Sequence, residues 1–151
     1  MTIIRPFQPE DAVTVSNLVR KVVKESLSRD YPEATIQLLY IEYRPEYFTE
    51  PIHEQTIFLA EEDDKIVGTA AIHNNLIMDL FVDPEYEGQG IGSKLIAHLE
   101  QLASLQGHTT TQISANPYAI DFYEKLGYEK VEETYLEPYD LWEIIVKKKL
   151  A

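Results

Sequence analysis

The 151-residue sequence has no cysteine, and its 13 lysine and arginine residues are half as many as its 26 aspartate and glutamate residues. Without cysteine there is no disulfide, no thiolate metal ligand and no cysteine nucleophile. Long apolar runs are missing too, since no stretch reaches the roughly 18 residues of a membrane-spanning helix. Residues 1–11 lack the basic start and the apolar stretch of a signal peptide. We therefore expect a soluble, cytoplasmic protein.

The formal net charge of −13 is unevenly distributed, because residues 51–100 hold ten acidic residues and only two basic ones, Lys65 and Lys94. Such a field repels the phosphates of nucleic acids and of anionic membranes, so we expect neither as a partner. It suits a cationic substrate, although a high net charge also serves solubility, and both interpretations stay open. The four histidines show no metal-ligand spacing, and we expect no metal site.

Length and periodicity predict one α/β domain over residues 1–151, in which 44% apolar residues fill a single core. The patterns predict strands at 2–7, 56–61, 65–73, 76–82, 109–114, 128–135 and 142–147. They predict a helix after 9–11, a short helix and loop at 33–47, a helix that ends at Gly107 and a short helix at 118–126. This order predicts a mixed central sheet of six to seven strands flanked by about four helices. Its antiparallel meander becomes parallel at a strand-helix-strand crossover.

A glycine-rich turn, Glu87-Gly88-Gln89-Gly90-Ile91-Gly92, separates the most apolar predicted strand from a long amphipathic helix. Glycines let the backbone approach a ligand closely, and the first N–H groups of a helix favour an anion such as a diphosphate. A dinucleotide fingerprint is excluded because Ser93 stands where its third glycine belongs, and no Gly-Lys-Ser or Gly-Lys-Thr of an ATP-binding loop follows. Two interpretations of the turn remain, a coenzyme A site and a tight turn without a ligand.

Two blocks of sequence carry a family resemblance. The first is Leu80-Phe81-Val82-Asp83-Pro84 with the glycine turn, and the second runs from Asn116 through Phe122-Tyr123-Glu124-Lys125-Leu126-Gly127 to Tyr128. Together they resemble the GNAT superfamily of acetyl-CoA-dependent N-acetyltransferases, although Glu87 stands where the family usually has Gln or Arg. The resemblance spans nearly the whole chain. It implies direct acetyl transfer from acetyl-CoA to a primary amine, which agrees with the absence of cysteine.

The resemblance also assigns cofactor contacts. It places Leu80, Phe81 and Val82 beside the pantetheine arm and its acetyl group, with main-chain groups of this strand pairing to the arm. It gives the diphosphate to the backbone N–H groups of Gly88, Gln89, Gly90, Ile91, Gly92 and Ser93. Asn116 is expected to hydrogen-bond the arm, although an asparagine before Pro117 also suits a helix cap.

By its position in the second block, the resemblance makes Tyr123 the predicted general acid, and a donor that protonates the departing sulfur would ease the release of coenzyme A. Ordinary core packing is the alternative for this tyrosine. Asp79 is the predicted contact or base for the amine, since it is the sole charge within 76–82. Alternation along the strand places it opposite Met78 and Leu80, so the role of a solvated or helix-facing structural group stays open.

The acceptor pocket is expected from residues 31–52 together with the turn at 135–140, because both segments are aromatic and acidic. Tyr40, Tyr43, Tyr47 and Phe48 would stack on a substrate or pack together. A non-catalytic acyl-CoA-binding module with the same fold is the alternative function. A homodimer built by the tyrosine-rich edge and the C-terminal strand is also open.

Overall fold

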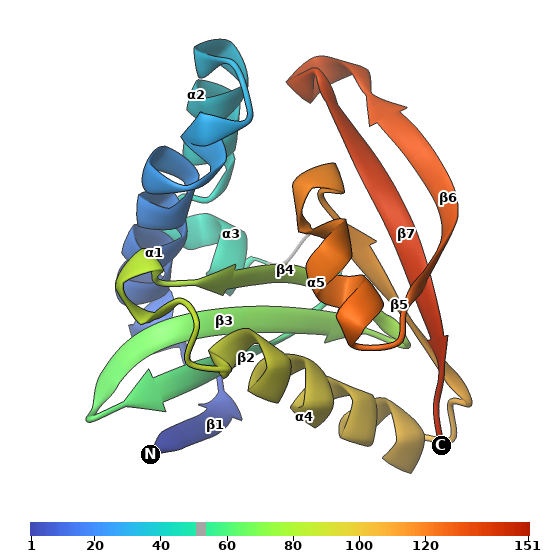
Figure 1. The fold of residues 1–151 in the computed structure, drawn as a ribbon. Helices are drawn as coiled ribbons and strands as arrows, with labels where there is room; N and C mark the ends of the chain where they lie inside the picture. The colour runs from blue at the N-terminus through green and yellow to red at the C-terminus, as the bar shows by residue number, and fades with distance from the viewer. Residues whose placement is uncertain (51–53) are drawn as a thin grey trace.

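The computed structural model describes residues 1–50 and 54–151 (Figure 1). Pro51, Ile52 and His53 lie outside the described residues, so the end of the predicted acceptor segment has no structural account. Within the described part of the chain there are seven strands: β1 (Thr2–Pro6), β2 (Thr56–Glu62), β3 (Lys65–His73), β4 (Leu76–Val82), β5 (Thr110–Ala115), β6 (Glu129–Leu136) and β7 (Leu141–Lys149).

The α-helices of the described residues are α1 (Ala12–Glu25), α2 (Glu33–Glu42), α3 (Pro45–Thr49), α4 (Ile91–Leu105) and α5 (Ile120–Lys125). Two short 3-10 turns matter below, η4 (Pro117–Ala119) and η5 (Glu137–Tyr139). The predicted helix and loop at 33–47 is in fact two helices, α2 and α3. Pro45 has no N–H to continue α2, yet its fixed backbone angle suits the first turn of α3. No helix of these described ranges is long and apolar enough to cross a bilayer.

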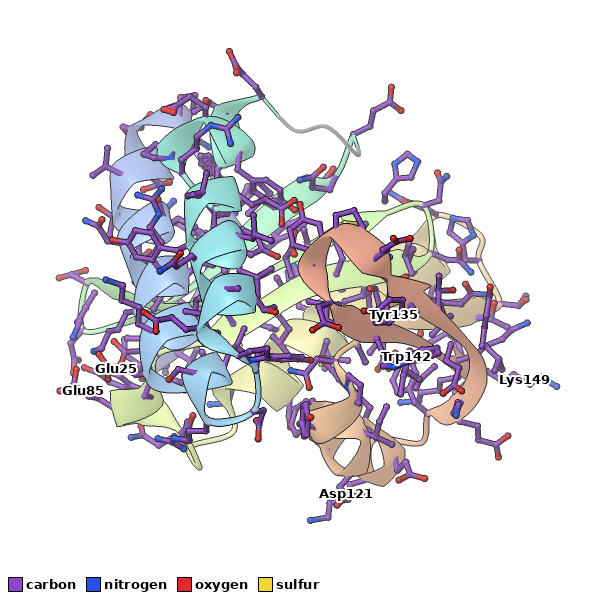
Figure 2. All side chains as sticks on the ribbon, turned by 90° about the horizontal axis from the view of Figure 1, so that it is seen from above. Glu25, Glu85, Asp121, Tyr135, Trp142 and Lys149 are labelled. Carbon is purple, nitrogen blue, oxygen red and sulfur yellow. The ribbon has the colours of Figure 1, made fainter. Side chains whose placement is uncertain are left out.

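The strands form one sheet in the order β1-β2-β3-β4-β5-β7-β6. All neighbours are antiparallel except β4 and β5, which are parallel and are connected through α4. This confirms the predicted mixed sheet and its crossover. The insertion of β7 between β5 and β6 was not predicted, because no local pattern specifies which strand of the last hairpin lies inside. Tyr135 of β6 and Trp142 of β7 lie side by side, with ring centroids 5.3 Å apart (Figure 2).

Helices cover both faces of the sheet and enclose two buried clusters (Figure 1). The first cluster, which we call the α1–α3 cluster, includes Val15, Val19 and Val23 of α1 packed on Leu59 of β2. The second, the α4–α5 cluster, includes Leu95 and Leu99 of α4, Ile113 of β5 and Tyr123 of α5. Apolar residues at helical spacing account for the buried stripes of α1 and α4. Strand β4 lies in the middle of the sheet and contributes side chains to both clusters.

Candidate active site

Strand β4 is central, yet all of its residues except Ile77 are only partly buried. It pairs with β3 as far as Val82, but with β5 only at Leu76 and Ile77. Beyond Ile77 the two parallel strands diverge, so the edge of β4 that faces β5 has no strand partner there. Backbone N–H and C=O groups at such an edge can pair with an extended, amide-rich ligand.

A β-bulge distorts β4 at Asp79. The pairing with β3 shifts from Met78 opposite Ala71 to Phe81 opposite Thr69, and Asp79 has a positive φ of 54°. A bulge inserts one extra residue and re-aims a side chain. Met78 therefore packs on the α1–α3 cluster, and Asp79 points to the same side because its partners belong to that cluster. The prediction that alternation sets Asp79 opposite Met78 is wrong, whereas the prediction that it lies opposite Leu80 is confirmed.

Two tyrosine hydroxyls hold the carboxylate of Asp79. Tyr43, at the end of α2, donates to Oδ1 at 2.9 Å, and Tyr47 of α3 donates to Oδ2 at 2.5 Å. Burial, followed by the charge of Asp79, raises the pKa of both tyrosines well above the ordinary value. Both phenols therefore stay protonated and act as hydrogen-bond donors at neutral pH. Sequence reasoning treated them as packing or stacking residues, because nothing local connects them to β4.

A cavity of about 380 Å³ opens beside Tyr47. Its lining comes from the end of α2, from α3 and from η5: Leu38, Ile41, Glu42, Arg44, Glu46, Tyr47, Glu50, Pro138 and Tyr139. The hydroxyl of Tyr139 donates to Glu42 at 2.8 Å and so links η5 to α2. The structure thus brings together the two segments that the sequence suggested for the acceptor, and three carboxylates line the cavity that they form.

The glycine turn has the geometry of an open backbone cradle. Gly88 and Gly90 have φ values of 78° and 79°, a conformation that side chains disfavour, and nothing lies within 4 Å of where a Cβ would stand on either. Helix α4 begins directly afterwards at Ile91, so its first N–H groups lack partners within the helix. This turn fits a diphosphate. Gln89 and Glu87 are exposed, and Ile91 is buried, so its side chain belongs to the core.

The loop between β4 and the glycine turn is fixed by Asp83, which is 3% exposed. Its carboxylate accepts from Lys21 of α1 at 2.9 Å and from the backbone N–H of Glu85 at 3.0 Å. Burial alone would raise the pKa of Asp83, but these donors and the Lys21 charge hold that pKa below its ordinary value. Lys21 also forms an ion pair with Glu85 of this loop at 2.5 Å, which ties the loop to α1.

Other predicted cofactor residues surround this region. Leu80 and Val82 pack on the α4–α5 cluster, whereas Phe81 lies in edge contact with Tyr43 at 5.3 Å. Gly92 is close to Phe122 of α5, which an added Cβ would meet at 3.2 Å, and Ser93 is partly buried. Asn116 accepts from the backbone N–H of Tyr118 at 2.7 Å. The cap interpretation of Asn116 is therefore confirmed, and its contact with a cofactor stays a prediction.

Tyr123 is 5% exposed and packs between Phe122 and Tyr128. Burial raises the pKa of its phenol, so the hydroxyl keeps its proton at neutral pH. Tyr123 belongs to the α4–α5 cluster, whereas the tyrosines that hold Asp79 belong to the α1–α3 cluster. The two predicted catalytic residues thus lie on opposite faces of the sheet.

A family model described as "Acetyltransferase (GNAT) domain" matches residues 27–138 of the chain. The chain belongs to the GNAT acetyltransferase family. This acetyltransferase is 31% identical over 121 residues to the peptidyl-lysine N-acetyltransferase YjaB of Salmonella typhimurium, a match that covers 75% of this chain and 82% of that protein. It is 36% identical over 63 residues to a thialysine N-epsilon-acetyltransferase of Bos taurus, covering 40% of this chain and 37% of that protein.

Solved structures of N-acetyltransferases have the same fold. A GCN5-related N-acetyltransferase of Rhodopseudomonas palustris superposes on the acetyltransferase with a TM-score of 0.90 at 25% identity, covering 99% of this chain and 96% of that one. The PaiA N-acetyltransferase of Thermoplasma acidophilum, solved in complex with coenzyme A, has a TM-score of 0.80 at 21% identity and covers 99% of both chains. The second likeness supports the fold alone. The predicted α/β fold and family are confirmed.

Proposed function

We propose that this chain moves an acetyl group from acetyl-CoA directly to a primary amine that carries a positive charge in solution. Asp79 receives the proton that the amine must lose, and Tyr123 protonates the sulfur that departs. The observation that carries this proposal is the placement of Asp79. Two hydroxyls hold it at a bulge of β4, just after the point where β4 and β5 diverge, and one of them belongs to Tyr47, which lines an acidic cavity.

Two stretches of accessible backbone, the glycine turn and the edge of β4, support the binding of acetyl-CoA. The N–H groups of residues 88–93 suit the diphosphate, and the edge of β4 beyond Ile77 suits the amide groups of the pantetheine arm. The amide nitrogen of Asn116 is the group expected to donate to that arm, since its oxygen already caps η4. Bound in this way, acetyl-CoA supplies an activated thioester carbonyl.

A cationic acceptor is supported by the lining of the cavity and by the relatives. Glu42, Glu46 and Glu50 face the same space, and the net charge of the chain is −13. The names of two relatives specify acceptors with an amine on an alkyl chain, a peptidyl-lysine and thialysine. A lysine-like primary amine fits both observations, whether it is carried by a small molecule or by a peptide.

The reaction assigns separate tasks to the two faces. An ammonium group has no lone pair with which to attack, so its proton must first pass toward Asp79. The new N–C bond then forms as the C–S bond breaks, and the proton of Tyr123 goes to the sulfur. The nitrogen of the new amide gives its second proton to the Tyr123 phenolate, which restores the phenol, and Asp79 releases its proton to solvent. A buried, neutral phenol suits the second task because it still carries its proton at neutral pH.

The test is Asp79→Asn, which keeps the size of the side chain and removes its charge. We expect kcat/KM for the amine to fall by roughly a hundredfold or more while the affinity for acetyl-CoA is retained. Glu132→Gln is the matched control, since it removes the same charge from the exposed face of β6. Loss of stability with normal kinetics in Asp79→Asn would make Asp79 a structural carboxylate.

The salt dependence of kcat/KM distinguishes long-range steering by the acidic residues from a close contact between the amine and Asp79. Steering by surface carboxylates weakens as salt rises, whereas a close contact with Asp79 is screened much less. We expect the Asp79→Asn defect to persist at high salt. Cytoplasmic location and a homodimer remain predictions, with the exposed Tyr135 and Trp142 as the proposed dimer surface.

A further inference from the structure

We infer that Tyr47 is a proton relay between the acceptor and Asp79. It accepts a proton from the bound ammonium as it passes its own hydroxyl proton to Oδ2 of Asp79. This inference rests on the proposed function, because it uses the same amine and the same carboxylate. It adds a catalytic role for a residue that the sequence assigned to stacking on a substrate or to packing.

The two tyrosines that hold Asp79 differ in what else they reach. Both donate to the carboxylate, and both are less than 9% exposed. Tyr47 also lines the cavity, whereas Tyr43 is not among the described residues that do so. Tyr43 instead packs between Phe81, at 5.3 Å, and Phe48, at 6.4 Å. An amine in the cavity can therefore contact Tyr47, which is hydrogen-bonded to Asp79, whereas Tyr43 does not line that space.

The distances support proton transfer through Tyr47. Its hydroxyl lies 2.5 Å from Oδ2, within the range of short O–H···O⁻ bonds, whereas the Tyr43 bond is 2.9 Å. The phenol oxygen retains lone pairs that can accept from a group in the cavity. One side chain can thus receive a proton on the cavity side and release one to the carboxylate.

Charged and titratable groups of several elements surround this hydroxyl. Asp79 accepts its hydrogen bond, and the ring of Tyr43 packs beside the ring of Tyr47 with centroids 4.9 Å apart. Glu42 of α2 and Tyr139 of η5 are also close enough to act on Tyr47 electrostatically. Glu46 and Glu50 of α3 and Arg44 before it line the same cavity. Two carboxylates, Asp79 and Glu42, therefore stabilise an ammonium beside the Tyr47 oxygen, and they disfavour a phenolate at this position.

Every proton in the transfer is accounted for, and Tyr47 stays neutral throughout. The N–H bond of the ammonium breaks as a new O–H bond forms on Tyr47, and the original Tyr47 O–H bond breaks as Oδ2 is protonated. The amine regains its lone pair, Tyr47 ends neutral and Asp79 ends protonated. A phenolate never forms, as the neighbouring carboxylates require.

The test compares Tyr47→Phe with Tyr43→Phe. Each variant removes one hydroxyl and one donor to Asp79 while keeping its ring, so both should move the acid limb of the pH profile to higher pH. Only Tyr47→Phe should also lower kcat at the optimum, by at least tenfold. That loss should shrink as pH approaches about 10.4, the ordinary pKa of a lysine-like amine, because the neutral amine needs no relay.

The results separate a relay from a positioning role and from failure of the proposed function. Equal losses in both variants at every pH would mean that Tyr47 only positions Asp79, and the relay would be overturned. If Tyr47→Phe melts far below the parent, a fluorinated tyrosine at position 47 replaces it. This variant keeps the hydroxyl and its bond to Asp79 but makes the hydroxyl more acidic, so the relay predicts a changed kcat, and an unchanged kcat would overturn it. Normal kinetics of Asp79→Asn would instead contradict the proposed function, so the two failures are distinguishable.

Discussion

The two faces of β4 form different kinds of site. On the side of α4 and α5, the groups suited to the cofactor are backbone N–H groups of the glycine turn and of the strand edge. On the side of α1, α2 and α3, the groups suited to the acceptor are side chains, above all Asp79, Tyr47 and Glu42. The cofactor half of the site, on the α4 and α5 side, depends on backbone conformation. The acceptor half, on the α1, α2 and α3 side, depends on residue identity.

This difference affects how each half responds to substitution. A backbone cradle tolerates changes in most side chains but fails when a glycine with positive φ is replaced. A side-chain site keeps its fold after a conservative change and loses its chemistry. The predictions below separate binding, turnover and stability along this division, and they begin with the largest expected effect.

Tyr123→Phe should lower kcat by between roughly a hundred and ten thousand fold, the usual contribution of general acid catalysis. The variant should keep its melting temperature and its affinity for acetyl-CoA. Tyr128→Phe is the matched control, because Tyr128 lies in the same cluster but donates to Glu100 at 2.7 Å and contacts Thr111 at 2.7 Å. It should lose stability and keep kcat. A Tyr123→Phe variant with normal turnover would make this tyrosine a packing residue.

Gly90→Glu should abolish the stabilisation that acetyl-CoA gives, which is about 2.7 kcal/mol at a hundred times the dissociation constant. The added carboxylate would lie in the anion cradle. Gly107→Glu is the control, since Gly107 also has a positive φ and open space but lies at the far end of α4. Thermal shift with and without acetyl-CoA measures both variants. If acetyl-CoA raised the melting temperatures of the two variants equally, the diphosphate would not bind in the turn at residues 88–93.

Asp83→Asn should cost about 2 kcal/mol of unfolding free energy at pH 7, since it weakens hydrogen bonds to a buried charged group. The folded-state pKa of Asp83 is lowered, so its contribution is present above about pH 4, near the unfolded value, and is lost as pH falls through the folded pKa. The difference from the parent should therefore narrow in acid. Glu85→Gln, an exposed partner of Lys21, should cost less.

The sequence predicted the glycine turn and the elements around it, because local rules govern them, whereas the binding of a diphosphate there stays a prediction. Glycine at Gly88 and Gly90, an apolar strand before them and an amphipathic helix after them define the turn within one short segment. The predicted antiparallel meander is local too, because its turn residues Asp63, Asp64 and Asn74 have the positive φ that tight hairpin turns use.

The acceptor half was predicted only as a region. The bulge at Asp79 depends on pairing with β3, so strict alternation misplaced it relative to Met78. The bonds from Tyr43 and Tyr47 to Asp79 join residues more than thirty positions apart, and no local periodicity reports such contacts. Residue type could not separate these two among ten tyrosines.

The most direct measurement is thiol release from acetyl-CoA in the presence of primary amines that are cationic at pH 7, with the products identified by mass spectrometry. Alcohols of matched length serve as controls. The account predicts saturable turnover, with one thiol released for each acetylated amine and with cationic amines ahead of neutral and anionic ones. A chain that is stabilised by acetyl-CoA but acetylates no amine would contradict the account and leave a non-catalytic acyl-CoA-binding module in its place.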